Sequence, residues 1–364
     1  MEAPTLSSSF VKEAAIRVGF DACGIAIASP LTEEEWGYEE WLRRGYQADM
    51  AYMEQHRDKR SDPTLLVPGA RSVIVLLSGY KPSQTMQGRV SGARIAQYAY
   101  GEDYHERIKR MLYELIAAIR QRYPDFEAKP CVDTVPISDK QWARRAGLGW
   151  IGRNTLLVNP VLGSYCNIGE LVTPSPADSY DTPIENRCGD CRVCVAACPN
   201  HALSESRANS FAMPSQSLVT TEGSNHALSE SRANSFAMPS QSMVTTEGSN
   251  HALTHSSINE LTHSSIPLLD ANRCASYHTV ENRAETLPSD IRLSGYAFGC
   301  DICQLVCPYN QTAAVRYTLT DERKAQLEAL ADADPATFKH FAKHSALNRI
   351  RHSQWLRNQK QQET

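Results

Sequence analysis

Eight of the eleven cysteines fall into two motifs, and they are the residues with the clearest chemistry in this sequence. The first motif is C-x2-C-x2-C-x3-C-P, formed by Cys188, Cys191, Cys194 and Cys198 before Pro199. This spacing is typical of bacterial ferredoxins with two 4Fe-4S clusters. The first three thiolates of such a run hold one cluster, and the fourth reaches the neighbouring cluster. One motif therefore predicts a second.

The second motif is split along the chain. Cys300, Cys303 and Cys307 before Pro308 give C-x2-C-x3-C-P, and Cys274 is the upstream cysteine left to complete the set. The crossing rule then predicts two ligand sets. These are Cys188, Cys191, Cys194 and Cys307 for one cluster, and Cys198, Cys274, Cys300 and Cys303 for the other.

Two zinc sites are the alternative for these cysteines, because C-x2-C pairs often bind zinc. Zinc ribbons rarely use the longer run that ends in Cys-Pro, so the spacing favours iron-sulfur clusters. Cys23, Cys131 and Cys166 stand outside the motifs and are expected to be small buried side chains.

Composition places few limits on function. The 364 residues carry a formal net charge of -4, which describes a soluble protein without a global basic excess. Residues 1–12 have neither an export signal nor a twin-arginine pair, and no stretch of about 18 apolar residues could cross a bilayer. The expected location is the cytoplasm, with no membrane partner, and nothing requires more than a monomer.

Strand and helix patterns alternate before the cysteine-rich segment. The run from Ser72 to Leu77 is apolar and rich in β-branched residues, which predicts a buried strand. Asp103 with Glu106 predicts a helix start, followed by apolar residues at helical spacing until Pro124. These are Ile108, Met111, Leu112, Leu115, Ile116 and Ile119. Alternation of this kind predicts an α/β domain over residues 1–175.

A tandem repeat interrupts the cysteine-rich segment. Residues 200–224 recur almost unchanged as residues 225–249, and a third copy begins at Asn250. The copies are rich in Ser, Asn and Thr, so a disordered surface loop is expected at about residues 200–266. Repeated histidines such as His201 could form a metal site, but tandem copying alone explains their spacing.

Four groups of short motifs precede the cysteines in a fixed order. They are Tyr98-Ala-Tyr-Gly-Glu-Asp-Tyr-His105, Val132-Asp-Thr-Val-Pro136, Arg145-Ala-Gly-Leu-Gly-Trp-Ile-Gly-Arg-Asn-Thr155, and Gly163-Ser-Tyr165 with Gly169-Glu-Leu171. With the cysteines, these motifs resemble the epoxyqueuosine reductases over roughly residues 5–360 outside the repeats. A single glycine-rich piece would indicate only a turn, so their order carries the resemblance.

The resemblance implies cobalamin beside the two clusters and reduction of epoxyqueuosine to queuosine in tRNA, the last step of queuosine biosynthesis. Electrons are expected to reach cobalamin through the clusters. Removing the epoxide oxygen as water also needs protons, and Asp133 matches the family's acid. Burial against the corrin is expected to keep this acid protonated. Read alone, Asp133 is equally an exposed aspartate before a turn.

Other residues match family positions around cobalamin. They are Arg60, Leu157, Ile168, Leu171 and Ser276. The arginine is expected at the polar periphery and the aliphatic residues against the corrin. Read alone, they are a surface charge and ordinary core residues. The chain departs from the family at Val135, usually Gly, and at Asp139-Lys140, usually an acidic-Arg pair, so the loop beside the acid is expected to differ in shape.

Together these patterns predict an α+β protein with three parts. An N-terminal α/β cobalamin-binding domain, 1–175, precedes a ferredoxin-like two-cluster domain, 176–320, and a helical basic tail, 321–364. From Phe338 to Gln362 the tail has six basic residues, no acidic residue, and Phe341 and Trp355 between them. Such a run is often a solvated helix face, but the resemblance implies that it binds tRNA.

An external donor such as a flavodoxin or ferredoxin system would supply the electrons. Two other functions remain open from the sequence. A reductive dehalogenase also joins such clusters to cobalamin, but it usually carries a twin-arginine signal. A non-catalytic ferredoxin-type electron carrier would use the α/β domain only as a scaffold.

Overall fold

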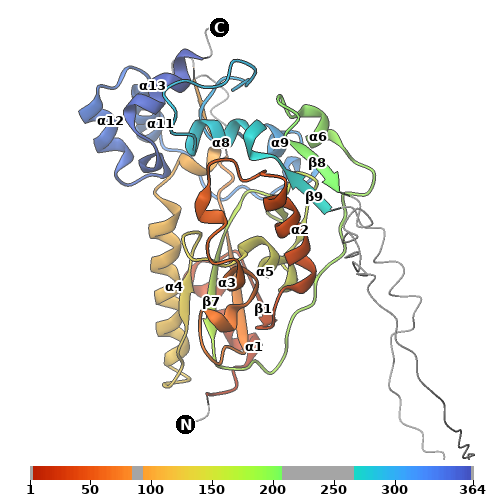
Figure 1. Cartoon of the computed structure of the whole chain (residues 1–364). Helices are drawn as coiled ribbons and strands as arrows, with labels where there is room; N and C mark the ends of the chain where they lie inside the picture. The colour runs from red at the N-terminus through yellow and green to blue at the C-terminus, as the bar shows by residue number, and fades with distance from the viewer. Residues whose placement is uncertain (1–2, 84–92, 207–265, 362–364) are drawn as a thin grey trace, which may run out of the picture. The chain divides into compact units, whose positions relative to one another are not determined.

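The computed structural model describes residues 3–83, 93–206 and 266–361 (Figure 1). The described residues belong to one compact unit, which spans Met1–Ser206 and Ile266–Thr364. The expected loop of tandem repeats therefore lies outside the described residues beyond Ser206. The three-part division of the chain stays a prediction.

A four-stranded sheet forms the centre of the N-terminal half, in the order β1-β2-β7-β4. Its strands are β1 (Ala22–Ile27), β2 (Ser72–Gly79), β7 (Cys166–Thr173) and β4 (Lys129–Cys131). The predicted strand is confirmed as β2, in which every residue is buried. All three pairings are antiparallel, whereas simple α/β alternation favours parallel strands. The protein is a mixed helix and sheet structure.

Helices cover both faces of this sheet. Helices α1 (Ser8–Val18) and α4 (Tyr104–Arg120) pack on one face, and α5 (Asp139–Arg145) lies in the hydrophobic cluster of the other. The predicted apolar stripe of α4 is confirmed, because its six residues are all buried. Gly169 in β7 permits this packing, since a Cβ there would lie 2.6 Å from Cγ2 of Ile108. Helix α4 thus begins beside the loop that follows β4.

Short elements connect these layers and carry the cysteines. The helices are α2 (Thr32–Arg43), α3 (Arg57–Ser61), α6 (Val193–Ala197), α8 (Ala275–Val280), α9 (Ile302–Leu305) and α10 (Pro308–Gln311). The strands are β5 (Trp150–Ile151), β6 (Leu157–Val158), β8 (Leu203–Ser206) and β9 (Ile266–Leu269). No helix within the described ranges is both long and apolar enough to span a membrane.

The C-terminal segment builds a second hydrophobic core. Its helices are α11 (Asp321–Ala329), α12 (Pro335–Ala342) and α13 (His352–Lys360), and its core includes β10 (Tyr296–Phe298) paired with β3 (Arg94–Ile95). The tail is helical, as expected. However, Trp355 is 0% exposed and donates through Nε1 to the Leu330 carbonyl at 3.0 Å. It is a core residue and is not available to stack on RNA.

Candidate active site

Asp133 lies in the loop between β4 and α5, with φ at 40°, a value uncommon for a residue other than glycine. Its Oδ2 accepts a 2.8 Å hydrogen bond from the Tyr104 hydroxyl and lies 3.0 Å from Nε2 of His105. The Tyr104 and His105 rings stack with centroids 4.0 Å apart at the start of α4. The helix start and the loop thus present one polar cluster.

The pKa of His105 is raised and that of Asp133 is lowered, which favours the proton on His105. Partial burial opposes the charged imidazole, but Asp103, 2.7 Å from Nδ1, and Asp133 outweigh it and raise the pKa of His105 to about 9. The hydrogen bond from His105 is the largest cause that lowers the pKa of Asp133. In this structure 58% of the Asp133 side chain is exposed, so the protein's own side chains do not bury it. Its expected burial against the corrin stays a prediction.

Charged and aromatic side chains from distant segments surround Asp133. Arg349 lies close enough to lower the pKa of Asp133, and it forms a bidentate ion pair with Glu281 at 2.9 Å. The charge of Asp133 also acts on Tyr52 and Tyr98, whose pKa values are raised mainly by burial. The basic tail therefore contributes one arginine to the surroundings of the acid.

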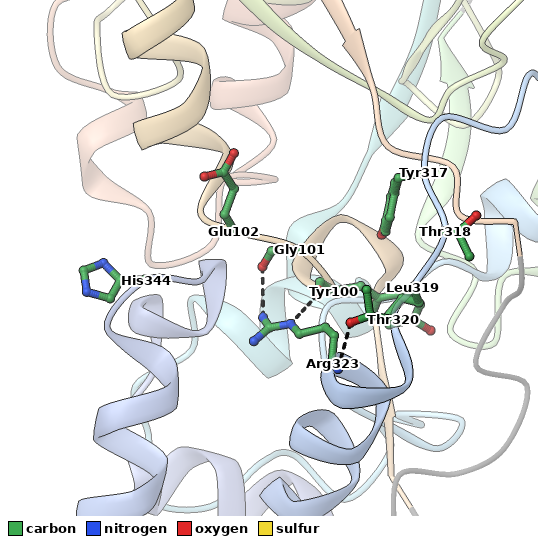
Figure 2. Close-up of a pocket in the computed structure, with 9 residues that line it drawn as sticks. All are labelled: Tyr100, Gly101, Glu102, Tyr317, Thr318, Leu319, Thr320, Arg323 and His344. Carbon is green, nitrogen blue, oxygen red and sulfur yellow. Dashed lines mark hydrogen bonds between the residues drawn. The ribbon is translucent and has the colours of Figure 1, made fainter.

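A cavity of about 390 Å³ lies beside the segment that leads into α4 (Figure 2). Arg323 donates to the carbonyls of Tyr100 and Gly101 at 2.7 and 3.0 Å, and its guanidinium lies 4.2 Å from the centroid of the Phe341 ring. These bonds tie α11 to the approach to Tyr104 and His105. The cavity thus borders the segment that positions them.

The first predicted ligand set has thiols that are electrostatic neighbours. Burial raises the pKa of Cys194, and Cys307, Cys188 and Cys191 raise it further. Burial likewise raises the pKa of Cys307, with smaller contributions from Cys188 and Cys191. These four cysteines are the predicted members of one set. All are free thiols.

The second predicted set shows the same relation. Burial raises the pKa of Cys300 to about 12, and Cys274 and Cys198 contribute. Burial raises the pKa of Cys303 well above its usual range, and Cys300 and Cys274 raise it further. Cys194 of the first set also raises this pKa. The two sets are therefore adjacent. In the part of the chain that is described, no three His, Cys, Asp or Glu side chains are gathered tightly enough to hold a metal ion.

Backbone N–H groups point at several of these sulfur atoms. The N–H of Ala202 donates to Sγ of Cys198 at 3.3 Å, and the N–H groups of Tyr277 and Ser276 act on Cys274. Such donors stabilise thiolate ligands of an iron-sulfur cluster. The donors at Cys198 and Cys274 are therefore compatible with thiolate ligands of an iron-sulfur cluster. The backbone N–H of Ser276 lowers the pKa of Cys274 in this structure.

The other residues expected around cobalamin divide between two sides of the sheet. Ile168 is partly buried and packs in the α5 side core with Leu157, which is 3% exposed. Leu171 is 0% exposed in the core of the opposite face. Residues three apart in a strand point to opposite faces, so Ile168 and Leu171 cannot present their side chains to the same ring.

Arg60 in α3 donates to the Tyr52 carbonyl at 3.1 Å, and its Nε is buried without a partner among the described residues. An unpaired buried donor is costly, and a bound acceptor would satisfy it. The charges of Arg60 and Asp133 both act on Tyr52, so the arginine and the acid border the same segment. This arrangement fits a polar ligand group at that position.

Comparisons with known proteins decide the family. A profile described as epoxyqueuosine reductase QueG, DUF1730, matches residues 60–134. An epoxyqueuosine reductase of Cyclobacterium marinum is 33% identical over 356 residues, which cover 96% of this chain and 95% of the relative. One of Leadbetterella byssophila is 33% identical and covers 94% of both chains. The chain belongs to the epoxyqueuosine reductase family. It is therefore an oxidoreductase.

Solved structures of epoxyqueuosine reductases share the fold. The Streptococcus thermophilus structure matches with a TM-score of 0.71 and 21% identity over 97% of this chain and 79% of the other. A complex with an epoxyqueuosine-modified tRNA stem loop matches with a TM-score of 0.70 and 23% identity over the same shares. A Bacillus subtilis structure, with its catalytic aspartate loop swung out of the active site, matches at 0.70 and 22% identity.

Two residues of this epoxyqueuosine reductase site had no assigned role in the sequence. Tyr104 and His105 end the motif that begins at Tyr98, and both contact Asp133. The available signal was the order Asp103, Tyr104, His105 at a helix start, because the aspartate caps the helix and also contacts the histidine ring. Arg349 was expected to bind tRNA as part of the basic tail, but its place near Asp133 could not be predicted because it depends on the C-terminal core.

Proposed function

We propose that this epoxyqueuosine reductase removes the epoxide oxygen of epoxyqueuosine in tRNA, with Asp133 as the group that hands over the proton. The observation that carries the proposal is the contact of Asp133 with His105 and Tyr104 at the start of α4. The net change is two electrons and two protons added, one C=C bond formed and one water released. The protein's own residues must supply the protons at the right place.

His105 is the proton store of the proposed site. Its pKa of about 9 leaves the imidazole charged at neutral pH, with Asp133 ionised beside it. As the epoxide oxygen develops negative charge, Asp133 can pass on a proton received from Nε2 of His105. Tyr104 donates to the same Oδ2 and fixes its orientation. Asp103 holds Nδ1 of His105 and keeps the ring aligned.

Two 4Fe-4S clusters and cobalamin would occupy the sites whose residues fit them. Cys188, Cys191, Cys194 and Cys307 would hold one cluster. The other set, Cys198, Cys274, Cys300 and Cys303, would hold the second. When bound, these groups supply the two electrons. An external flavodoxin or ferredoxin would reload them.

Cobalamin would lie against the α5 side of the sheet. Arg60 would face its polar periphery, with Ile168 and Leu157 beside the ring. Leu171 could take part only through its backbone, because its side chain is on the other face. Ser276 would support the cluster side of the site through its N–H contact to Cys274.

The tRNA would approach over the tail. One structure in the comparison contains an epoxyqueuosine-modified tRNA stem loop, which supports the same substrate class here. Arg349 is paired with Glu281 near Asp133, and Lys339, Lys343 and Arg351 are exposed. Exposed cations can bind backbone phosphates. We place the reaction in the cytoplasm, where thiols stay reduced.

The test is anaerobic turnover of the protein loaded with iron, sulfide and cobalamin on tRNA that contains epoxyqueuosine. Mass spectrometry of the nucleosides is expected to show loss of one oxygen, and Asp133→Asn is expected to abolish it. No conversion by protein with full cluster and corrinoid content would contradict the assignment.

A further inference from the structure

Two buried carboxyl groups lie behind the loop that carries Asp133. Glu170 in β7 is 0% exposed and is the cross-strand partner of Cys131, the last residue of β4. Asp139 is the first residue of α5, and its Oδ1 is buried. The loop of residues 132–138, called here the Asp133 loop, therefore begins beside Glu170 and ends at Asp139.

A backbone N–H at Asp139 lowers the pKa of its own carboxyl, but three oxygens of the pair are left without a donor. Both oxygens of Glu170 and Oδ1 of Asp139 lack a hydrogen-bond partner, yet the two side chains are within hydrogen-bonding reach of each other. Ionised carboxylates only accept hydrogen bonds, so this contact becomes a bond only when one of the two groups carries a proton. Burial raises the pKa of both, which favours that proton.

The charged and titratable neighbours do not replace the proton. Lys140 favours the charged form of Asp139, but its Nζ donates to the Thr155 carbonyl at 2.8 Å. Asp133 faces the pair from the loop, and its negative charge raises the pKa of both groups. Cys131, on β4, is a buried thiol whose pKa is raised by its burial. The pair is therefore held together by a proton rather than by a cation.

We propose that Asp139 and Glu170 share one proton and act as positioning residues that hold the Asp133 loop in its catalytic position. Glu170 pairs across the strands with Cys131, which directly precedes the Asp133 loop. Its side chain also interacts with Asp139, which directly follows the loop. Glu170 therefore links both ends of the Asp133 loop to β7. Asp133 has a positive φ, which costs free energy unless its surroundings impose it. The inference rests on the proposed role of Asp133.

The shared proton makes this anchor sensitive to alkaline pH. Once the proton is lost, two buried carboxylates face each other without a donor and repel. The start of α5 then separates from β7, and the Asp133 loop loosens. Burial raises the pKa of Asp139 to about 7 and raises that of Glu170 well above its usual range, so the change is expected at alkaline pH.

The experiment compares Asp139→Asn, Glu170→Gln and Asp139→Ala with the wild-type enzyme, each loaded with clusters and cobalamin. An amide at either position keeps a permanent donor, whereas alanine removes the bond. Hydrogen exchange of residues 132–138, expressed as protection factors, is measured at about pH 6 and about pH 9. Exchange requires no turnover, so its result is independent of whether the chain reduces epoxyqueuosine.

Wild-type protection is expected to fall about tenfold per pH unit above the pair's pKa. In both amide variants, residues 132–138 are expected to stay protected from exchange at both pH values. In the alanine variant they are expected to be unprotected at both. A kcat loss in Asp139→Ala that Asp139→Asn restores, with KM unchanged, would support positioning. Equal protection in all four proteins, or wild-type protection that does not change with pH, would overturn the proposal. If the alanine variant does not fold, the two amide variants still decide.

Discussion

Asp133 and His105 form a contact in which the pKa of the carboxyl is lowered and that of the imidazole is raised. Asp133 was assigned from its place in a family motif, but its protonation could not be predicted from the sequence. The partner that sets it, His105, is 28 positions away and reaches Oδ2 only because α4 starts beside the loop after β4. A charged neighbour at 3.0 Å outweighs partial burial for Asp133. In the proposed reaction, His105 and Asp133 therefore act together as the proton donor.

Replacing His105 by Gln is expected to remove the proton store and lower the rate of epoxide reduction by about 10²–10⁴-fold. In the wild type, the rate is expected to fall as pH rises through about 9, where His105 loses its proton. Single-turnover rates on epoxyqueuosine-containing tRNA from pH 6 to pH 10 test this. His344→Gln is the control, since His344 is 69% exposed and lies 3.7 Å from Glu106. An unchanged pH profile in His105→Gln would contradict the role of His105 as the proton store.

The same group predicts a stability change with pH. The folded pKa of His105 is raised above its ordinary value of 6.5 to about 9. Its contribution to the free energy of unfolding is therefore full below about pH 6.5 and is lost as pH rises through about 9. Thermal unfolding of the wild type and His105→Gln is expected to differ most at about pH 6 and to converge near pH 10. A constant difference would show that His105 acts through packing alone.

The helices and strands whose apolar residues follow a regular spacing could be predicted from the sequence. The six-residue stripe of α4 and the apolar run of β2 are buried as expected, because a helix face and a strand need only a hydrophobic neighbour. The tail was harder to predict. The family resemblance implied that the tail binds tRNA, but Trp355 packs in a core shared with β3 and β10. That long-range contact is not encoded by any local pattern.

Trp355→Ala is expected to lower the free energy of unfolding by about 3–5 kcal/mol, because it leaves a cavity and removes the hydrogen bond from Nε1 to the Leu330 carbonyl. The neighbouring Leu356 is 37% exposed, so Leu356→Ala is the matched control and is expected to change little. Urea unfolding of both variants measures the difference. Equal midpoints for the two variants would contradict the core role of the tryptophan.

The basic residues of the tail have different expected roles. Arg351 is exposed, whereas Arg357 donates to the carbonyls of His278, Asn282 and Ala284. Arg351→Gln is expected to weaken tRNA binding and reduce the slope of log affinity against log salt by about 0.7–1. Arg357→Gln is expected to reduce stability instead. Binding titrations at several salt concentrations test both, and an unchanged slope in Arg351→Gln would exclude that contact.

For the whole molecule, the tandem repeats raise the question of how a cluster tolerates a long insertion. Cys198 and Cys274 belong to the same predicted set, 76 positions apart. The strands between these cysteines bring the two chain segments together, because β8 and β9 pair from Leu203 with Leu269 to Ser206 with Ile266. Glu205, within the first repeat copy, pairs with Arg153 and Arg192. The sequence suggested an independent insertion, but its first residues are part of the folded unit.

Deleting residues 207–256, two repeat lengths, shortens the connection between Cys198 and Cys274 to 26 positions and leaves β8 intact. Closing the shorter connection costs less chain entropy, so the free energy of unfolding is expected to rise by about 1 kcal/mol. Deleting residues 204–261 also removes Glu205 and leaves Arg153, 16% exposed, without that partner, which is expected to cancel the gain. Urea midpoints and iron content of the reconstituted proteins separate the two cases. If the first deletion lost iron, the repeats themselves would be needed to bring Cys198 and Cys274 to the same cluster.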